Sequence, residues 1–220
     1  YLQHGTDYVY DLNSARKDGI VPLNYRVWWG MEDKHLFEYA KVKLTEMSES
    51  GKPFAFTMLT VDTHHIGGYK CDLCWNEYTE NYENVIACSS RQTAAFVDWI
   101  KEQDFYEDTA IIICGDHLSM DAEYFSRNIN SEYERHVYNC IINPSAEAEN
   151  VKNRVITPMD MFPTTLAALG CKIDGDRLGL GTNLFSGLET LAEKYGLDAL
   201  NTELAKHSDY YNDNFIKNDG

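Results

Sequence analysis

Two short stretches of the sequence place a carboxylate beside an imidazole directly after an apolar run. The first is Asp116–His117, which follows TAIIICG at residues 109–115. The second is DTHH at residues 62–65, which follows FAFTMLTV at residues 54–61. Carboxylate oxygen and neutral imidazole nitrogen are both ligands of divalent metals such as Zn and Mn. Both stretches therefore indicate a site that could bind a metal or an anion.

A purely structural role would explain the same residues without a metal. Asp116 could cap a following helix while His117 forms a local hydrogen bond. If the two bind a metal, they supply two ligands, so one or two more must come from elsewhere. Adjacent residues of an extended chain point in opposite directions, so we expect only one of His64 and His65 to face a site. Asp62 could orient an imidazole or simply begin a turn.

Apolar runs and helical patterns indicate which elements position these residues. Three short apolar runs, residues 54–61, 109–115 and 137–143, lack clean alternation, as strands covered on both faces do. Apolar residues recur at helical spacing in three further segments, residues 34–50, 83–103 and 157–170. This order predicts an α/β fold with a mostly parallel central sheet and helices on both faces. Ligands bind at the carboxyl ends of such strands, so both motifs should lie at one edge.

Composition argues against several classes of partner. The 19 Lys and Arg residues face 35 Asp and Glu residues, giving a net charge of −16. That charge disfavours a nucleic-acid backbone or an anionic lipid surface as the main partner. No apolar stretch approaches the roughly 20 residues of a membrane span, and no signal peptide is visible. Because the chain begins with Tyr1, we expect it to be a fragment or a processed form of a longer protein.

The cysteines allow a disulfide but do not match a standard zinc motif. Cys71 and Cys74 form a CxxC motif, and Cys88 follows in the same polar region. A zinc knuckle is not expected, because no second CxxC or His pair lies at suitable spacing. In an oxidising compartment Cys71 or Cys74 could pair with Cys88, and the sequence leaves open which of them does so.

Two other segments have both a functional and a structural interpretation. Trp28 and Trp29 could form an aromatic wall for a glycerol or sugar group, although we expect core packing for at least one of them. The glycine-rich stretch at residues 178–187 does not lead from a strand into a helix as a phosphate-binding loop does. We interpret it as a packing loop.

Several segments, taken in order, resemble the phosphoglycerol transferase family. They are TVDTHHIGGY, IIICGDHLSM, DMFPTTLAALG and LGLGTNLFSG, preceded by HGTDYVYD and NYRVWWGMEDKHLFEYA. The resemblance covers about residues 1–188, and residues 189–220 form an acidic tail that we expect to be helical. It implies the α/β fold of the alkaline phosphatase and sulfatase superfamily, to which lipoteichoic acid synthase also belongs. The chain would then be the C-terminal part of a catalytic domain.

The resemblance also implies roles for individual residues. Asp116 and His117 match the family's metal-binding pair, and the metal would be one divalent ion, expected to be Mn, with Zn or Mg as alternatives. His64 matches a histidine that contacts glycerol phosphate, and Arg135 is a further candidate for contact with that anion. In the family, the nucleophilic threonine and an acidic metal ligand lie upstream of the segment with which this chain begins. We therefore expect these 220 residues alone to be inactive.

The implied activity is transfer of phosphoglycerol from phosphatidylglycerol through a covalent threonine intermediate. The acceptor would be a hydroxyl of a periplasmic glucan or of a glycerol phosphate polymer. The implied location is the outer face of the bacterial cytoplasmic membrane, with anchoring segments upstream of this chain. One alternative is a sulfatase or phosphodiesterase of the same superfamily. Another is a non-catalytic extracytoplasmic binding domain, which would have no metal at Asp116 and His117.

Overall fold

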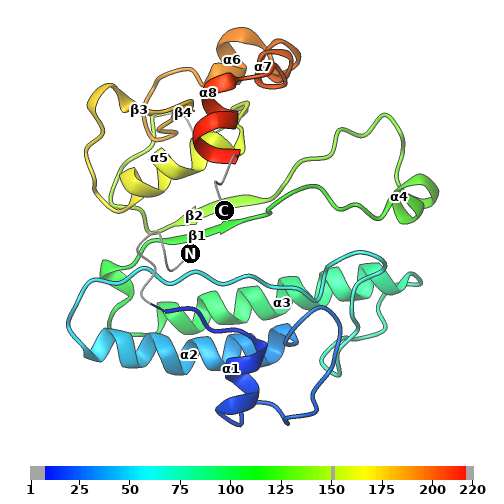
Figure 1. Ribbon diagram of the computed structural model, residues 1–220. Helices are drawn as coiled ribbons and strands as arrows, with labels where there is room; N and C mark the ends of the chain where they lie inside the picture. Colours follow the sequence, from blue (N-terminus) through cyan, green and yellow to red (C-terminus); the bar gives the residue numbers. More distant parts are fainter. Residues whose placement is uncertain (1–7, 150–151, 217–220) are drawn as a thin grey trace. The chain divides into compact units, whose positions relative to one another are not determined.

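A computed structural model of the protein describes residues 8–149 and 152–216 (Figure 1). The chain divides into two compact units. The first comprises Tyr1–Glu107 and Gly115–Val137, and the second comprises Asp108–Cys114 and Tyr138–Gly220. The N-terminal motif HGTDYVYD is described only from Tyr8 onward.

Two long helices form the core of the first unit. Helix α2 (Asp33–Glu49) and helix α3 (Asn81–Lys101) pack against each other (Figure 1). The aromatic rings of Phe37 in α2 and Phe96 in α3 have centroids 5.1 Å apart, and both side chains are buried. Apolar residues at helical spacing predict both helices, and the structure confirms them within a few residues of their expected ends.

Two shorter helices in this unit begin at aspartate caps. The carboxylate of Asp11 accepts a hydrogen bond from the Ser14 N–H at the start of α1 (Leu12–Lys17). The carboxylate of Asp121 accepts one from the Tyr124 N–H at the start of α4 (Ala122–Asn128). Such side-chain bonds satisfy N–H groups that have no partner inside the helix. The short 3₁₀ helix η2 (Tyr106–Asp108) follows α3.

The apolar run at residues 54–61 does not form the expected strand within the described part of the chain. Its residues alternate between half-buried and exposed from Phe54 to Thr60, and Leu59 is 76% exposed. A strand needs the backbone hydrogen bonds of a neighbour, and none of the described residues supplies them here. The apolar pattern therefore located a segment suited to a sheet, but not its partner.

The other two predicted strands form in the second unit, with a direction that differs from the prediction. Strand β1 (Ile111–Cys114) pairs antiparallel with β2 (Asn139–Ile142), placing Ile111 opposite Ile142 (Figure 1). Both sheets among the described residues have two strands and are antiparallel, so the mostly parallel central sheet is not seen in them. A four-residue apolar run identifies a strand but does not determine whether its neighbour runs parallel or antiparallel.

Helix α5 (Pro158–Ala168) and a small hairpin form the centre of the second unit. The helix starts with Pro158 behind a Thr157 capping box, and it is followed by Gly170 at a φ of +81°, as its sequence predicts. The hairpin consists of β3 (Arg177–Leu178) and β4 (Gly181–Thr182), after the 3₁₀ helix η3 (Asp174–Asp176). Gly181 packs so closely that a Cβ atom would lie 2.0 Å from the Met159 carbonyl oxygen. The glycine-rich stretch is therefore a packing loop, as expected.

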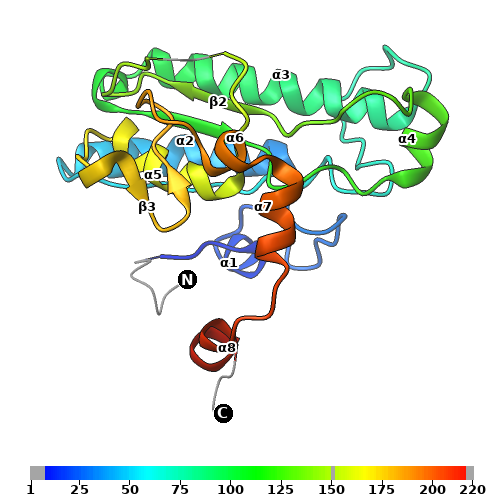
Figure 2. The same cartoon turned by 90° about the horizontal axis from the view of Figure 1, so that it is seen from above.

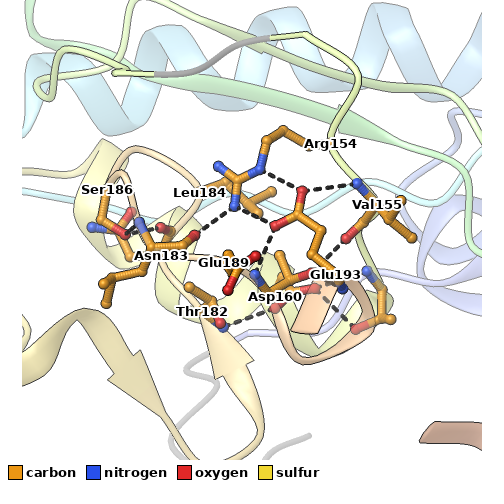
Figure 3. Close-up of polar contacts among 12 residues, drawn as sticks. Arg154, Val155, Asp160, Thr182, Asn183, Leu184, Ser186, Glu189 and Glu193 are labelled. Atoms are coloured by element: carbon orange, nitrogen blue, oxygen red, sulfur yellow. Dashed lines mark hydrogen bonds and ion pairs between the residues drawn. The ribbon is translucent and has the colours of Figure 1, made fainter. Parts of the chain in front are cut away.

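Buried and half-buried polar contacts connect the elements of the second unit (Figure 3). The two carboxylate oxygens of Asp160 accept hydrogen bonds from the backbone N–H groups of Thr182 and Thr157, each at 2.8 Å. Arg154 forms two hydrogen bonds with the carboxylate of Glu193, at 2.7 and 2.9 Å. Bonds of this charge-assisted, two-point kind fix both distance and orientation.

The acidic tail is helical in its described part, as expected. Helix α6 (Leu191–Tyr195) leads through Gly196 into α7 (Leu197–Leu204), shown in orange in Figure 2. A helical turn α8 (Asp209–Tyr211) and the π-helical turn η4 (Asn212–Ile216) follow. Residues 217–220 of the predicted tail lie outside the described part. None of the described helices has the length and apolar character needed to cross a membrane.

Candidate functional site

The two motifs lie on two loops of the first unit that Tyr82 connects. We call residues 62–68 the histidine loop and residues 115–121 the Asp-His loop. The hydroxyl of Tyr82, on α3, donates a hydrogen bond to the Thr63 carbonyl at 3.1 Å and forms a second bond with the Ser119 hydroxyl at 2.8 Å. One buried side chain, that of Tyr82, therefore holds together the loops that carry the two sequence motifs.

Asp121 makes a second connection between the same loops. One of its carboxylate oxygens caps α4, and the other accepts a hydrogen bond from the Gly67 N–H at 2.7 Å. Its side chain is buried. The sequence analysis missed both Asp121 and Tyr82 as residues that position the site. The position of Asp121 before a helix could have indicated a cap, but its second bond to a distant loop has no sequence signal.

Asp116 and His117 lie side by side at the exposed end of the Asp-His loop. The Nδ1 atom of His117 lies 2.8 Å from the carbonyl oxygen of Leu118. A carbonyl only accepts, so Nδ1 carries the proton and the neutral imidazole keeps its lone pair on Nε2. Nε2 lies 3.5 Å from an Asp116 carboxylate oxygen. Two ligands at about 2.1 Å from one tetrahedral metal lie about 3.4 Å apart, so this pair fits a single ion.

The alternative structural roles of this pair are only partly met. Asp121, rather than Asp116, caps the helix that follows, so the cap that the structural alternative assigned to Asp116 is not formed. His117 does form the local hydrogen bond that the structural interpretation expects. Among residues 8–149 and 152–216, no third carboxylate, imidazole or thiolate joins the pair. The described residues thus provide two metal ligands and not a complete site.

His64 packs between two aromatic rings on the histidine loop. Its ring centroid lies 4.6 Å from that of Trp29 and 4.6 Å from that of His65. Nδ1 bonds the His65 carbonyl at 2.7 Å, which leaves Nε2 as the free nitrogen. The loop turns here, with the His64 N–H bonded to the Val61 carbonyl, and the two imidazole rings stack, so the opposite directions typical of an extended chain are not found.

The adjacent tryptophans are both outside the core. Trp28 is 40% exposed and Trp29 is 68% exposed, so the expectation of core packing for one of them is wrong. The reason is a tight turn closed by a bridge between Val27 and Gly30, which carries both indoles at its tip. Exposed indole beside His64 is the arrangement that an aromatic wall requires.

Arg135 contacts the Asp-His loop from the segment after α4. Its guanidinium donates a hydrogen bond to the Ser119 carbonyl at 3.0 Å and lies over the ring of Phe125, 4.2 Å from the centroid. The contact uses one of the five N–H groups of the guanidinium. Arg135 therefore helps to position the loop that carries Asp116 and His117.

Comparison with known proteins identifies the family. The family profile described as "Sulfatase" matches residues 1–171. The chain belongs to the sulfatase family. It is also similar to phosphoglycerol transferase I from Escherichia coli O139:H28 and from Shigella boydii serotype 18, each 31% identical over 192 residues. These matches cover 84% of this chain and 24% of each relative, so the chain spans about a quarter of the length of the curated relatives it matches. No solved structure gives a significant match.

Membership of the sulfatase family fits the chemistry of the two loops. The family implies an α/β fold of the alkaline phosphatase type, and its enzymes generally use a divalent metal. Asp116 and the free Nε2 of His117 are suitable donors for such an ion.

Asp62 is buried in this sulfatase-family chain without a partner for its carboxylate. Its side chain is 2% exposed, and neither oxygen accepts a hydrogen bond from the described residues. Burial, and then the nearby charge of Asp33, raise the pKa of Asp62 to about 7. Of the two roles left open for Asp62, orienting an imidazole is not seen, because a carboxylate in that role accepts a hydrogen bond from the ring. Asp62 does lie at the start of a turn, which the His64 N–H closes on the Val61 carbonyl.

Two cavities of the structure do not coincide with the Asp116–His117 pair, whose side chains suit a metal. A cavity of about 540 Å³ lies in the second unit and is lined by residues such as Glu147, Asp176 and Asn183. A smaller hollow of about 120 Å³ lies beside the histidine loop and is lined by Gly67 and Tyr82 among others. Neither contains the Asp116–His117 pair. We place the candidate site at the two loops, because a carboxylate oxygen and an imidazole nitrogen lie there at a separation that suits one divalent metal ion.

Proposed function

We propose that this chain is part of a metal-dependent phosphoglycerol transferase at the outer face of the bacterial cytoplasmic membrane. The observation that carries the proposal is the Asp116–His117 pair, whose free Nε2 and carboxylate oxygen lie 3.5 Å apart in a sulfatase-family chain. The names of the relatives support phosphoglycerol as the transferred group. The proposed donor is phosphatidylglycerol, and the acceptor is a hydroxyl of a glucan or of a glycerol phosphate polymer.

Three residues of the two loops and two residues that contact them have roles in this proposal. Asp116 and His117 hold a divalent ion, expected to be Mn, together with ligands from outside the described residues. When bound, the ion supplies positive charge that offsets charge on the phosphoryl oxygens and lowers the pKa of a coordinated hydroxyl. The free Nε2 of His64 hydrogen-bonds the phosphoglycerol, and the exposed Trp29 indole packs against its glycerol carbons. The unused N–H groups of Arg135 can donate to a phosphate oxygen.

The transfer proceeds in two displacements at phosphorus. In the first, the oxygen of a threonine upstream of this chain bonds to phosphorus, the bond from phosphorus to the diacylglycerol oxygen breaks, and diacylglycerol leaves with the proton. In the second, the acceptor hydroxyl attacks the same phosphorus and gives up its proton, and the threonine oxygen leaves and is protonated again. The covalent intermediate divides one difficult displacement into two easier ones.

The test uses the whole protein that contains this chain. It is incubated with Mn²⁺ and phosphatidylglycerol, and intact-mass spectrometry followed by peptide mapping measures covalent phosphoglycerol. We expect an adduct on a threonine in the natural protein, no adduct in His117→Ala, and an unchanged adduct in His207→Ala. His207 is a suitable control because it is an exposed histidine in the tail of the second unit.

The other outcomes would favour the alternative functions. Hydrolysis of a sulfate ester or a phosphodiester without an adduct on threonine would identify a sulfatase or phosphodiesterase of the same superfamily. A protein that forms no adduct and binds no metal at Asp116 and His117 would be a non-catalytic binding domain.

A further inference from the structure

Three cysteines converge on one point in the first unit. Cys71 and Cys74 lie on the loop that follows the histidine loop, and Cys88 lies in α3. The Sγ atom of Cys71 is 3.6 Å from that of Cys74 and 3.9 Å from that of Cys88. All three sulfur atoms lie within 4.8 Å of one another. Cys71 and Cys88 are buried, whereas Cys74 is half-buried, and all six cysteines of the chain are unpaired in the structure.

We propose that Cys71, Cys74 and Cys88 bind a zinc ion that fastens the loop of residues 69–80 to α3. Zinc binds thiolate sulfur at about 2.3 Å in tetrahedral geometry, which places two sulfur ligands about 3.8 Å apart. Two of the three separations, 3.6 and 3.9 Å, lie on either side of that value, and the third is within 4.8 Å. The site is distinct from the Asp116–His117 pair, since it draws only on thiol ligands, which favour a softer ion than carboxylate does.

Two of the three proposed zinc ligands, Cys71 and Cys88, accept hydrogen bonds at their sulfur atoms. Burial raises the pKa of the Cys71 thiol, and the Leu73 backbone N–H acts in the opposite direction by bonding to it. The side-chain amide of Gln92 donates to the Sγ of Cys88 at 3.5 Å, from one turn further along α3. Donors of this kind orient metal ligands and stabilise their charged form.

The coordination number leaves one position for solvent. No carboxylate or imidazole of the described residues joins the three sulfur atoms, so a water molecule would complete the tetrahedral coordination of a zinc ion held by them. Binding replaces three thiol protons by one Zn²⁺ ion and needs no oxidant or reductant. Because those protons must leave, zinc binding should strengthen as the pH rises.

A metal accounts for the third cysteine better than a disulfide does. A disulfide between Cys88 and either Cys71 or Cys74 would use two sulfur atoms and leave the third without a role. The sequence pattern gave no zinc motif because the third ligand is a single cysteine on a helix, with no second CxxC or His pair beside it. Only the packing of the loop against α3 brings it into place.

The test measures metal content and thiolate ligation in the purified protein. Elemental analysis should find zinc in the natural protein, and exchange for Co²⁺ should give the near-ultraviolet absorption of sulfur bonded to cobalt. Cys74→Ser should lose the zinc and the sulfur–cobalt absorption, whereas Cys171→Ser should retain both. Cys171 is the matched control because it is exposed and lies in the second unit. His117→Ala should also retain both, since that residue belongs to the other site.

Two results on the natural protein would overturn the proposal without depending on any variant. One is a disulfide that joins Cys88 to Cys71 or Cys74, found by mapping peptides of unreduced protein. The other is a folded protein that stays free of zinc at micromolar Zn²⁺ while all three thiols react with an alkylating reagent. Cys74→Ser is preferred to Cys88→Ser because Cys88 is buried, and its replacement would test folding as well as binding.

Discussion

At the scale of single residues, the candidate site is defined mainly by which donor atoms are free and which polar groups have no partner. The Leu118 carbonyl fixes the His117 tautomer, so the nitrogen that remains free is the one beside Asp116. Sequence could predict that a carboxylate and an imidazole are adjacent, but not which imidazole nitrogen is free, because a backbone carbonyl decides it. Asp62 shows the reverse case, since one of the two roles left open by the sequence needs a partner for its carboxylate, and the described residues provide none.

Asp62→Asn should make the protein more stable at pH 8 and leave it nearly unchanged at pH 4. The folded state keeps the Asp62 proton up to a pKa of about 7, whereas the unfolded chain releases it near pH 4. Folding stability therefore falls as the pH rises between these values, by up to about 4 kcal/mol. The neutral amide should remove this fall. Urea unfolding at pH 4 and pH 8 measures it.

The control for Asp62 is Asp98→Asn, because the Asp98 side chain is 72% exposed. It should change the free energy of unfolding little at either pH. If Asp62→Asn destabilises the protein equally at both pH values, the carboxylate has a structural partner, and its raised pKa does not govern stability.

At the scale of elements, sequence periodicity predicted helices better than sheets. Helices α2, α3 and α5 are confirmed because each carries its own apolar stripe, and α5 also has a local cap. Strands β1 and β2 lie where the sequence placed them but pair antiparallel, and residues 54–61 find no partner among the described residues. A strand depends on a distant segment, which a local pattern does not identify.

Tyr82→Phe should weaken the link between the two loops of the candidate site. The change removes the hydroxyl that bonds Thr63 and Ser119 but keeps the ring packed against Tyr124. We expect a loss of about 1–2 kcal/mol in the free energy of unfolding. The whole protein should also form the phosphoglycerol adduct more slowly, because the loops position His64 and the Asp116–His117 pair.

The matched control for this change is Tyr78→Phe, whose ring is 53% exposed. Adduct formation and urea unfolding are measured for both variants. Equal behaviour of the two variants would mean that the Tyr82 hydroxyl does not hold the loops together. A slower adduct at unchanged stability would assign it to positioning alone.

At the scale of the whole molecule, the net charge of −16 should make folding depend on salt. Excess negative charge destabilises a compact state by self-repulsion, and salt screens that repulsion over about 8 Å at physiological ionic strength and about 3 Å at 1 M. We therefore expect the melting temperature to rise between about 0.05 and 0.5 M NaCl, because the screening length falls from above about 10 Å to below about 8 Å over this range. Differential scanning fluorimetry at pH 8 measures this rise.

The seven histidines provide an internal control for the role of charge. The net charge of −16 counts them as neutral, so every proton they bind on acidification makes it less negative, and the gain in melting temperature with salt should be smaller at pH 5.5 than at pH 8. An equal gain at both pH values would indicate a general salting effect on apolar surface instead. A melting temperature that falls with salt would show that ion pairs such as Arg154–Glu193 outweigh the repulsion.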